Sequence, residues 1–186
     1  IGVHSNASYL NKPKARSRVG GHHFLSMNDK IPANNRAVLN ISQIIKAVMS
    51  SAAELELGAL FINAKQAVPQ RTTLEEMGHP QPTTPIQTNN STAYGVVNHK
   101  IQPKATKAMD MWFHWLQDRE CQKQFRVYWR PGPTNKADYW TKHHAGKHHQ
   151  NFRPEIVSST RVLDALKQVL AKKHLSGVKP LMARVC

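Results

Sequence analysis

Two acidic residues are the first candidates for chemistry. Glu54 borders the apolar stripe of an expected helix, close to Leu57 and Phe61, whereas Glu56 points to roughly the opposite side. A carboxylate beside a buried face needs a partner or a metal ion, and the alternative is a rim glutamate that reaches solvent. Asp138 stands at the start of a short expected helix, where the helix dipole stabilises a negative charge. Neither position identifies a site by itself.

The charge balance indicates a polyanionic partner. The 186 residues include 26 Lys and Arg against 11 Asp and Glu, which gives a formal net charge of +15. Nucleic acid is the leading interpretation, and a solvated basic face is the alternative. No apolar run is long enough to cross a bilayer and no leader opens the chain, so we expect no membrane partner. Two cysteines are too few for a disulfide framework and favour an intracellular, reducing compartment, a cytoplasmic particle or the nucleus.

Basic and aromatic side chains are interleaved in the second half of the chain. Such a surface can hold phosphates and stack on sugars or bases, although Trp112 also fits the apolar face of a helix. The predicted phosphate-binding residues are Lys100, Lys104, Lys107, Arg126 and Arg130.

The elements that must position these residues follow from hydrophobic patterning. Strands are predicted over 1–10, 15–27, 37–48, 85–88 and 125–129, and helices over 52–77, 91–98, 104–121 and 135–143. Gly20-Gly21 suggests a bulge in the second strand, and Pro69 is expected to bend or interrupt the long helix. This order predicts an α/β fold, or mixed α+β layers, with a five-stranded mixed sheet that begins with three antiparallel strands and is flanked by helices.

The character of the chain changes near its C-terminal end. We expect one domain over residues 1–155 and an appendage over 156–186, made of an amphipathic helix and a basic tail. The apolar face of 160–174 is a candidate surface for a protein partner.

Five segments resemble, in order and spacing, the RNase H domain of copia-type retrotransposon polyproteins. They are residues 5–9 (SNASY), 50–57 (SSAAELEL), 88–93 (TNNSTA), 107–114 (KAMDMWFH) and 137–142 (ADYWTK). The similarity spans about residues 1–150, and the predicted order of strands and helices is also that of the RNase H fold.

The resemblance implies a two-metal endonuclease that cuts the RNA strand of RNA–DNA hybrids. In that family four carboxylates hold two Mg²⁺ ions, and Mn²⁺ is the alternative cofactor. The four positions fall on Asn6, Glu54, Asn89 and Asp138, so Glu54 and Asp138 are the remaining candidate metal ligands. The partners implied are an RNA–DNA hybrid or another nucleic acid, and the reverse transcriptase portion of the polyprotein.

Two further roles come from the same resemblance. Asn90 matches the family's Asn after the fourth-strand acid and is a candidate nucleic-acid contact. His143 or His144, near the last acid, could assist proton transfer or product release. The histidine-rich segment 143–149 could instead bind a transition metal, but we favour a basic, flexible loop over the nucleic acid.

The two asparagines decide the functional prediction. Asn6 and Asn89 stand where the family has Asp, so two of the four carboxylate charges are missing, and neither Asp29 nor Asp110 replaces them convincingly. We therefore predict an RNase H-like nucleic-acid-binding domain with impaired catalysis. The alternatives are a domesticated structural or interaction subunit of a larger assembly and a weakly active ribonuclease H.

Overall fold

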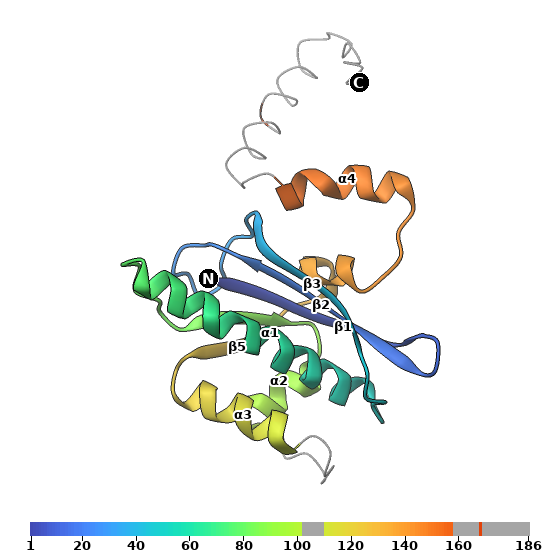
Figure 1. Cartoon of the computed structure of the whole chain (residues 1–186), viewed down its shortest axis with the longest axis horizontal. Helices are drawn as coiled ribbons and strands as arrows, with labels where there is room; N and C mark the ends of the chain where they lie inside the picture. The colour runs from blue at the N-terminus through green and yellow to red at the C-terminus, as the bar shows by residue number, and fades with distance from the viewer. Residues whose placement is uncertain (102–109, 158–167, 169–186) are drawn as a thin grey trace.

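A five-stranded mixed sheet forms the centre of the fold (Figure 1). The computed structural model describes residues 1–101, 110–157 and 168. Within them the strands are β1 (Gly2–Lys12), β2 (Arg16–Phe24), β3 (Ala37–Ile45), β4 (Thr84–Thr88) and β5 (Phe125–Trp129). The first three pair antiparallel, β4 joins β1 in parallel and β5 joins β4 in parallel, which gives the order β3-β2-β1-β4-β5. The predicted mixed sheet with its antiparallel start is confirmed.

Helices cover the sheet from two sides (Figure 1). On one side lie α1 (Ala52–Glu76), α2 (Ser91–Val97) and α3 (Asp110–Cys121), and on the other the short 3₁₀ helix η2 (Lys136–Trp140) contacts β1, β2 and β3. The 3₁₀ turn η1 (Gly132–Thr134) leads into η2, and α4 (Gly146–Val157) follows it. The apolar core lies between the sheet and α1, where Val3, Val19, Leu60 and Ile86 are fully buried.

The two glycines of β2 give the helices access to the sheet. The pairing of β2 runs through Gly20 and Gly21 without a register shift, so the predicted bulge is wrong. A Cβ atom on Gly20 would lie 2.4 Å from the carbonyl oxygen of Ala137 in η2, and one on Gly21 would lie 1.9 Å from Oδ1 of Asn63 in α1. Because successive strand residues face opposite sides, one glycine accommodates each layer.

The helices differ from the predictions in three places. Helix α1 begins at the predicted cap, where Ser51 accepts a hydrogen bond from the Glu54 N–H, and it continues through Pro69 without interruption. The last predicted helix is a 3₁₀ helix. The segment 143–149 was predicted to be a flexible loop, and this prediction is wrong for its second half. His148 and His149 lie on helix α4.

Some predictions fall on residues that the structure does not describe. These are the first turns of the helix predicted at 104–121 and nearly all of 156–186, although α4 continues past the proposed boundary at residue 155 to Val157. In the described part of the chain, no helix combines the length and the hydropathy needed to span a membrane.

Candidate functional site

Asn6 and Asp138 meet although they are 132 residues apart in the sequence. The side-chain amide of Asn6, almost fully buried in β1, donates to Oδ1 of Asp138 at 2.9 Å and to Oγ1 of Thr141 at 3.1 Å. The NH₂ group must face the carboxylate, because an ionised carboxylate only accepts hydrogen bonds. Asp138 also forms an ion pair with Lys142, at 2.7 Å.

The short helix that carries Asp138 is fastened to the sheet at its start. Asn135 caps η2 by accepting from the Ala137 N–H at 3.0 Å, and its amide donates to the carbonyl of Ser5 at 2.7 Å. The absence of a side chain at Gly20 lets the backbone of Ala137 lie against β2. These contacts fix where the Asp138 carboxylate sits relative to β1.

Glu56 is the second carboxylate of the site. Its Oε1 accepts from the Ala7 N–H at 3.1 Å, next to Asn6 on β1, and the residue is buried. Its Oε2 is buried and has no hydrogen-bond partner in the described part of the chain. Burial, with a smaller contribution from the Asp138 charge, raises the pKa of Glu56 to about 8, so it is largely protonated at neutral pH.

Glu54 does not lie where the helical pattern placed it. Its carboxylate turns back to the start of α1, where it accepts from the backbone N–H and the hydroxyl of Ser50. The stripe used for the prediction, with Leu57 and Phe61, includes the face that packs on α3, where Phe61 stacks on Trp112. Glu56 lies on the face toward the sheet. The structure therefore corrects the expected position, and Glu56 is the residue that the sequence argument missed.

A recognisable signal marks the sheet-facing side of α1. Small buried residues recur on it at helical spacing, at Ala59, Asn63 and Ala67, and Glu56 lies one turn before Ala59 and Leu60. Small residues allow the close approach of helix and sheet. Helical spacing from these positions would have selected Glu56.

Asn89 lies at the end of β4 next to β1. The parallel register pairs Val3 with Ile86 and His4 with Gln87, so its continuation brings Asn89 level with Asn6. The Asn89 carbonyl accepts from the indole N–H of Trp129 at 3.0 Å. Asn90 caps α2 by accepting from the Ala93 N–H at 2.8 Å, a structural role for this candidate nucleic-acid contact.

The two predicted site histidines lie beside η2. The exposed His143 contacts the ammonium group of Lys12 at 3.0 Å through Nε2. His144 stacks on Tyr139 and on His148, and its Nε2 contacts the Tyr139 carbonyl at 3.2 Å. Burial, more than its neighbours, lowers the pKa of His144. Neither histidine hydrogen-bonds to Asp138 in the described structure.

The candidate phosphate-binding residues do not all share this face. Arg130 follows β5 and donates its backbone N–H to the Thr88 carbonyl at 3.0 Å, at the end of the sheet where Asn89 lies. Arg126 stands near the start of β5, toward the opposite end, and donates to the Lys30 carbonyl. Lys100 follows α2 and donates to the hydroxyl of Tyr94. Lys104 and Lys107 lie outside the described residues.

The fold has counterparts among solved RNase H structures. LC11-RNase H1, isolated from compost by a metagenomic approach, matches with a TM-score of 0.56 and 10% identity over 75% of this chain and 90% of its own. The same protein in complex with an RNA/DNA hybrid gives 0.55 and 10% identity over 75% and 91%. The N-terminal RNase H domain of a Mycobacterium tuberculosis protein gives 0.52 and 12% identity over 75% and 95%.

These likenesses show that the fold is RNase H-like. No model of a protein family matches the chain, and no curated protein matches its sequence.

Proposed function

We propose that this chain is an RNase H-like nucleic-acid-binding domain of a copia-type retroelement polyprotein, impaired in hydrolysing the RNA strand of RNA–DNA hybrids. The observation that carries the proposal is the Asn6 amide, which donates a hydrogen bond to Asp138 where the family resemblance implies a second carboxylate. The five family-like segments support the origin, and the hybrid bound by LC11-RNase H1 supports the substrate class.

The donor set does not fit a pair of divalent cations. Asn6 and Asn89 are neutral, the charge of Asp138 is balanced by Lys142, and burial raises the pKa of Glu56 to about 8, so a cation would have to displace its proton at neutral pH. Two Mg²⁺ or Mn²⁺ ions would meet little compensating charge, because the amide oxygens of Asn6 and Asn89 can ligate a hard cation but carry no charge. The buried Oε2 of Glu56 is an available oxygen, but alone it supports weak binding of one ion at most. We therefore derive no hydrolytic step for this chain.

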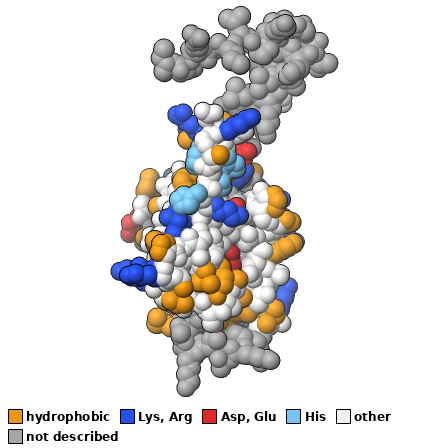
Figure 2. All heavy atoms as spheres, turned by 90° about the vertical axis from the view of Figure 1, so that its right-hand side faces the viewer, with side chains coloured by type: hydrophobic (Ala, Val, Ile, Leu, Met, Phe, Trp, Pro, Cys, Tyr) orange, Lys and Arg blue, Asp and Glu red, His pale blue; other side chains and the backbone are white. Residues whose placement is uncertain are grey.

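Binding of a hybrid relies instead on positive charge around the same edge of the sheet. Arg130, Lys12 and His143 lie near the site, and Figure 2 shows histidine side chains close to lysine and arginine side chains, with few acidic side chains, on the hairpin side of the molecule. Contacts to phosphates need no base recognition, which suits a duplex recognised by its backbone shape.

The test compares cleavage and binding of a labelled RNA–DNA hybrid by the full chain and by Asn6→Asp/Asn89→Asp, in Mg²⁺ and separately in Mn²⁺. Glu56→Gln in the revertant should abolish cleavage, and Glu54→Gln is its matched control. For binding, Arg130→Gln should lower the affinity and reduce the slope of log Kd against log salt by about 1, whereas Arg126→Gln should change neither.

The outcomes separate the hypotheses. The proposal is supported if the unmodified chain binds the hybrid without cutting it and Asn6→Asp/Asn89→Asp cuts it. Cleavage by the chain itself that Glu56→Gln abolishes would overturn the proposed impairment. If neither protein cuts or binds the hybrid, the interaction subunit becomes the better hypothesis, and proteins that associate through residues 160–174 become the object of the search.

Two further parts of the proposal concern context. We propose the reverse transcriptase portion of a polyprotein as the covalent neighbour, on the strength of the resemblance alone. We also propose a reducing intracellular compartment, which is consistent with the free, exposed thiol of Cys121.

A further inference from the structure

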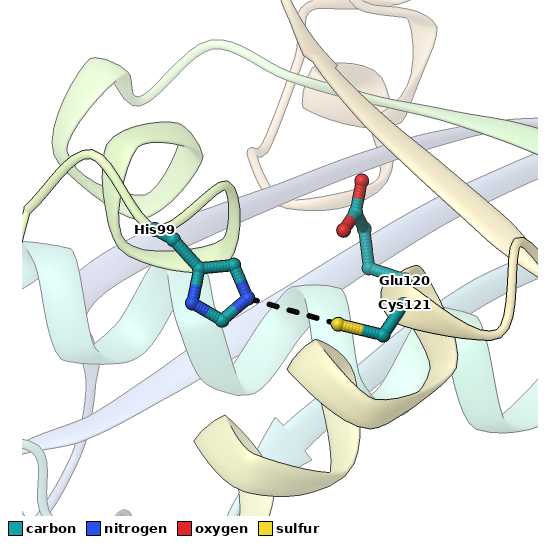
Figure 3. Close-up of side chains that lie close together, drawn as sticks. All are labelled: His99, Glu120 and Cys121. Atoms are coloured by element: carbon teal, nitrogen blue, oxygen red, sulfur yellow. Dashed lines mark hydrogen bonds between the residues drawn. The ribbon is translucent and has the colours of Figure 1, made fainter.

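Three residues with metal-ligand side chains meet where α2 and α3 end. His99 follows α2, and Glu120 and Cys121 close α3, as Figure 3 shows. One ligand atom from each lies within 4.8 Å of the other two, and Nε2 of His99 is 4.0 Å from Sγ of Cys121. This cluster lies at the opposite end of α2 from Asn90, so it is separate from the acidic site.

The backbone holds His99 in an unusual conformation. Its φ is +56°, in the left-handed region that glycine normally occupies after a helix end. The turn is fixed by the bonds from the His99 N–H to the Val96 carbonyl and from the Lys100 N–H to the Gly95 carbonyl. A glycine would serve the turn, but only histidine directs an imidazole toward the end of α3.

Two helix ends and one carboxylate supply the negative charge of the cluster. The C-terminal ends of two helices converge here, and the aligned peptide dipoles give a helix C-terminal end partial negative charge. The nearby ammonium group of Lys100 is engaged by the Tyr94 hydroxyl at 2.9 Å, and the Arg119 guanidinium by the Gln124 side chain at 3.1 Å. These neutral partners fix the position of the two positive groups but leave their charge, which the Glu120 carboxylate and the helix ends offset in part.

We propose that His99, Glu120 and Cys121 bind one Zn²⁺ or a similar borderline-soft divalent cation. Imidazole nitrogen, thiolate sulfur and carboxylate oxygen are the ligands that this class of ion takes, and water would complete a tetrahedron. Zinc–ligand bonds of about 2.0–2.3 Å place neighbouring ligand atoms about 3.5 Å apart, so the 4.0 Å separation needs only a small closure. His99 and Cys121 are both exposed, so the closure displaces no packed core.

Gln117 orients the imidazole from behind. Its side-chain amide contacts Nδ1 of His99 at 3.1 Å, on the ring atom that points away from Cys121. When Nε2 of His99 binds a metal, Nδ1 carries the proton, and rotation of the Gln117 amide presents its oxygen as the acceptor at the expense of the 3.3 Å hydrogen bond from the Gln117 amide to the Val96 carbonyl. Outer hydrogen bonds of this kind hold a ligating histidine in one tautomer.

Titration of the full chain with Co²⁺ under reducing conditions tests the site. We expect one equivalent to bind with a thiolate-to-cobalt charge-transfer band, and Zn²⁺ to displace it. Cys121→Ser should remove the band, and His99→Gln should weaken binding by at least about tenfold. Cys186→Ser and His148→Gln/His149→Gln are the controls and should leave band and affinity unchanged, with tryptophan fluorescence confirming the fold of each variant.

Binding of Co²⁺ through Cys186 or through the histidines of α4 would give the opposite pattern among these variants. A band that survives in Cys121→Ser, or that disappears in Cys186→Ser, would overturn the proposal. So would a stoichiometry or affinity that depends on His148 and His149 but is insensitive to His99→Gln, because the ion would then be held by the histidines of α4.

Discussion

The contact between Asn6 and Asp138 depends on an N–H of the Asn6 amide, which an aspartate at position 6 would lack. The Asn6 amide donates to Oδ1 of the carboxylate, and the Lys142 ammonium group lies 2.7 Å from that oxygen and 2.9 Å from Oδ2. The arrangement is complete without a metal ion, because donors already satisfy the acid. A carboxylate at position 6 would convert an attraction into a repulsion between two negative groups, one of them buried.

Asn6→Asp should therefore make folding depend on a divalent cation. We expect the variant to lose roughly 3 kcal/mol of unfolding free energy in EDTA, since a buried charge without compensation is costly, and to recover much of it in Mg²⁺ or Mn²⁺. Urea unfolding with and without metal measures both changes. Asn28→Asp, at an exposed position after β2, is the matched control and should show neither effect.

The wild-type chain makes the complementary prediction. Its unfolding midpoint should be nearly the same in EDTA and in Mg²⁺ if, as we propose, the site offers too little negative charge for a pair of ions. A large stabilisation of the wild-type chain by Mg²⁺, absent in Glu56→Gln, would show that two carboxylates suffice and would contradict our account of the site.

At the scale of elements, β1 brings the site together because every other part is attached to it. It pairs with β2 and β4, bears Asn6, and holds η2 through the Ser5 carbonyl. The approach of η2 further requires the bare backbone at Gly20. The position of Asp138 thus depends on a residue with no functional group.

Gly20→Ala should displace η2 while leaving the sheet intact. The new Cβ would meet backbone at Ala137, which cannot rotate away as a side chain could, so we expect a loss of about 2 kcal/mol in unfolding free energy. Gly146→Ala is the control, because nothing lies within 4 Å of its Cβ position. Equal stabilities of the two variants in urea would show that η2 adjusts freely.

Regular elements followed from local patterning, and the site geometry did not. All five strands and the helices α1 and α2 appear within a few residues of the predicted ranges, because alternation and capping residues are local signals. The structure places Glu56, and not Glu54, beside β1. The sequence pattern did not separate the two residues, because α1 packs on both the sheet and α3 and its apolar stripe does not show which residues face which neighbour. The same limit made Gly20-Gly21 look like a bulge, since their neighbours come from Asn63 and Ala137, far away in the sequence.

At the scale of the whole molecule, buried groups titrate in opposite directions. Burial lowers the pKa of His4 to about 3 and that of His23 to about 4, and it also lowers the pKa of His22. The unfolded chain therefore takes up protons at these histidines near pH 6.5 while the folded chain does not, so they reduce stability as pH falls. Glu56 has the opposite effect: its pKa is raised to about 8, so protonation on acidification favours the folded state.

These opposing effects predict that the free energy of unfolding falls only slowly as the pH drops below 7. One substitution, Glu56→Gln, should make this fall steep. As the pH falls from 7 to 5, His4 and His23 together lower the free energy of unfolding by about 4 kcal/mol, and His22 lowers it further. Over the same range Glu56 raises the free energy of unfolding by about 2.5 kcal/mol. Glu56→Gln removes the stabilisation that Glu56 provides on acidification. The variant should therefore be more stable than wild type at pH 7 by about 3 kcal/mol and lose most of that advantage by pH 5.

Urea unfolding in EDTA at several pH values measures the two curves, and Glu54→Gln should follow the wild type because its carboxylate is not buried beneath β1. His23→Gln should flatten the acid limb by about 2 kcal/mol, whereas His149→Gln, at an exposed position of α4, should not. Parallel curves for wild type and Glu56→Gln would mean that Glu56 is ionised in the folded protein. Glu56 would then offer a charged oxygen near Asp138, and the two carboxylates together would favour the binding of a cation.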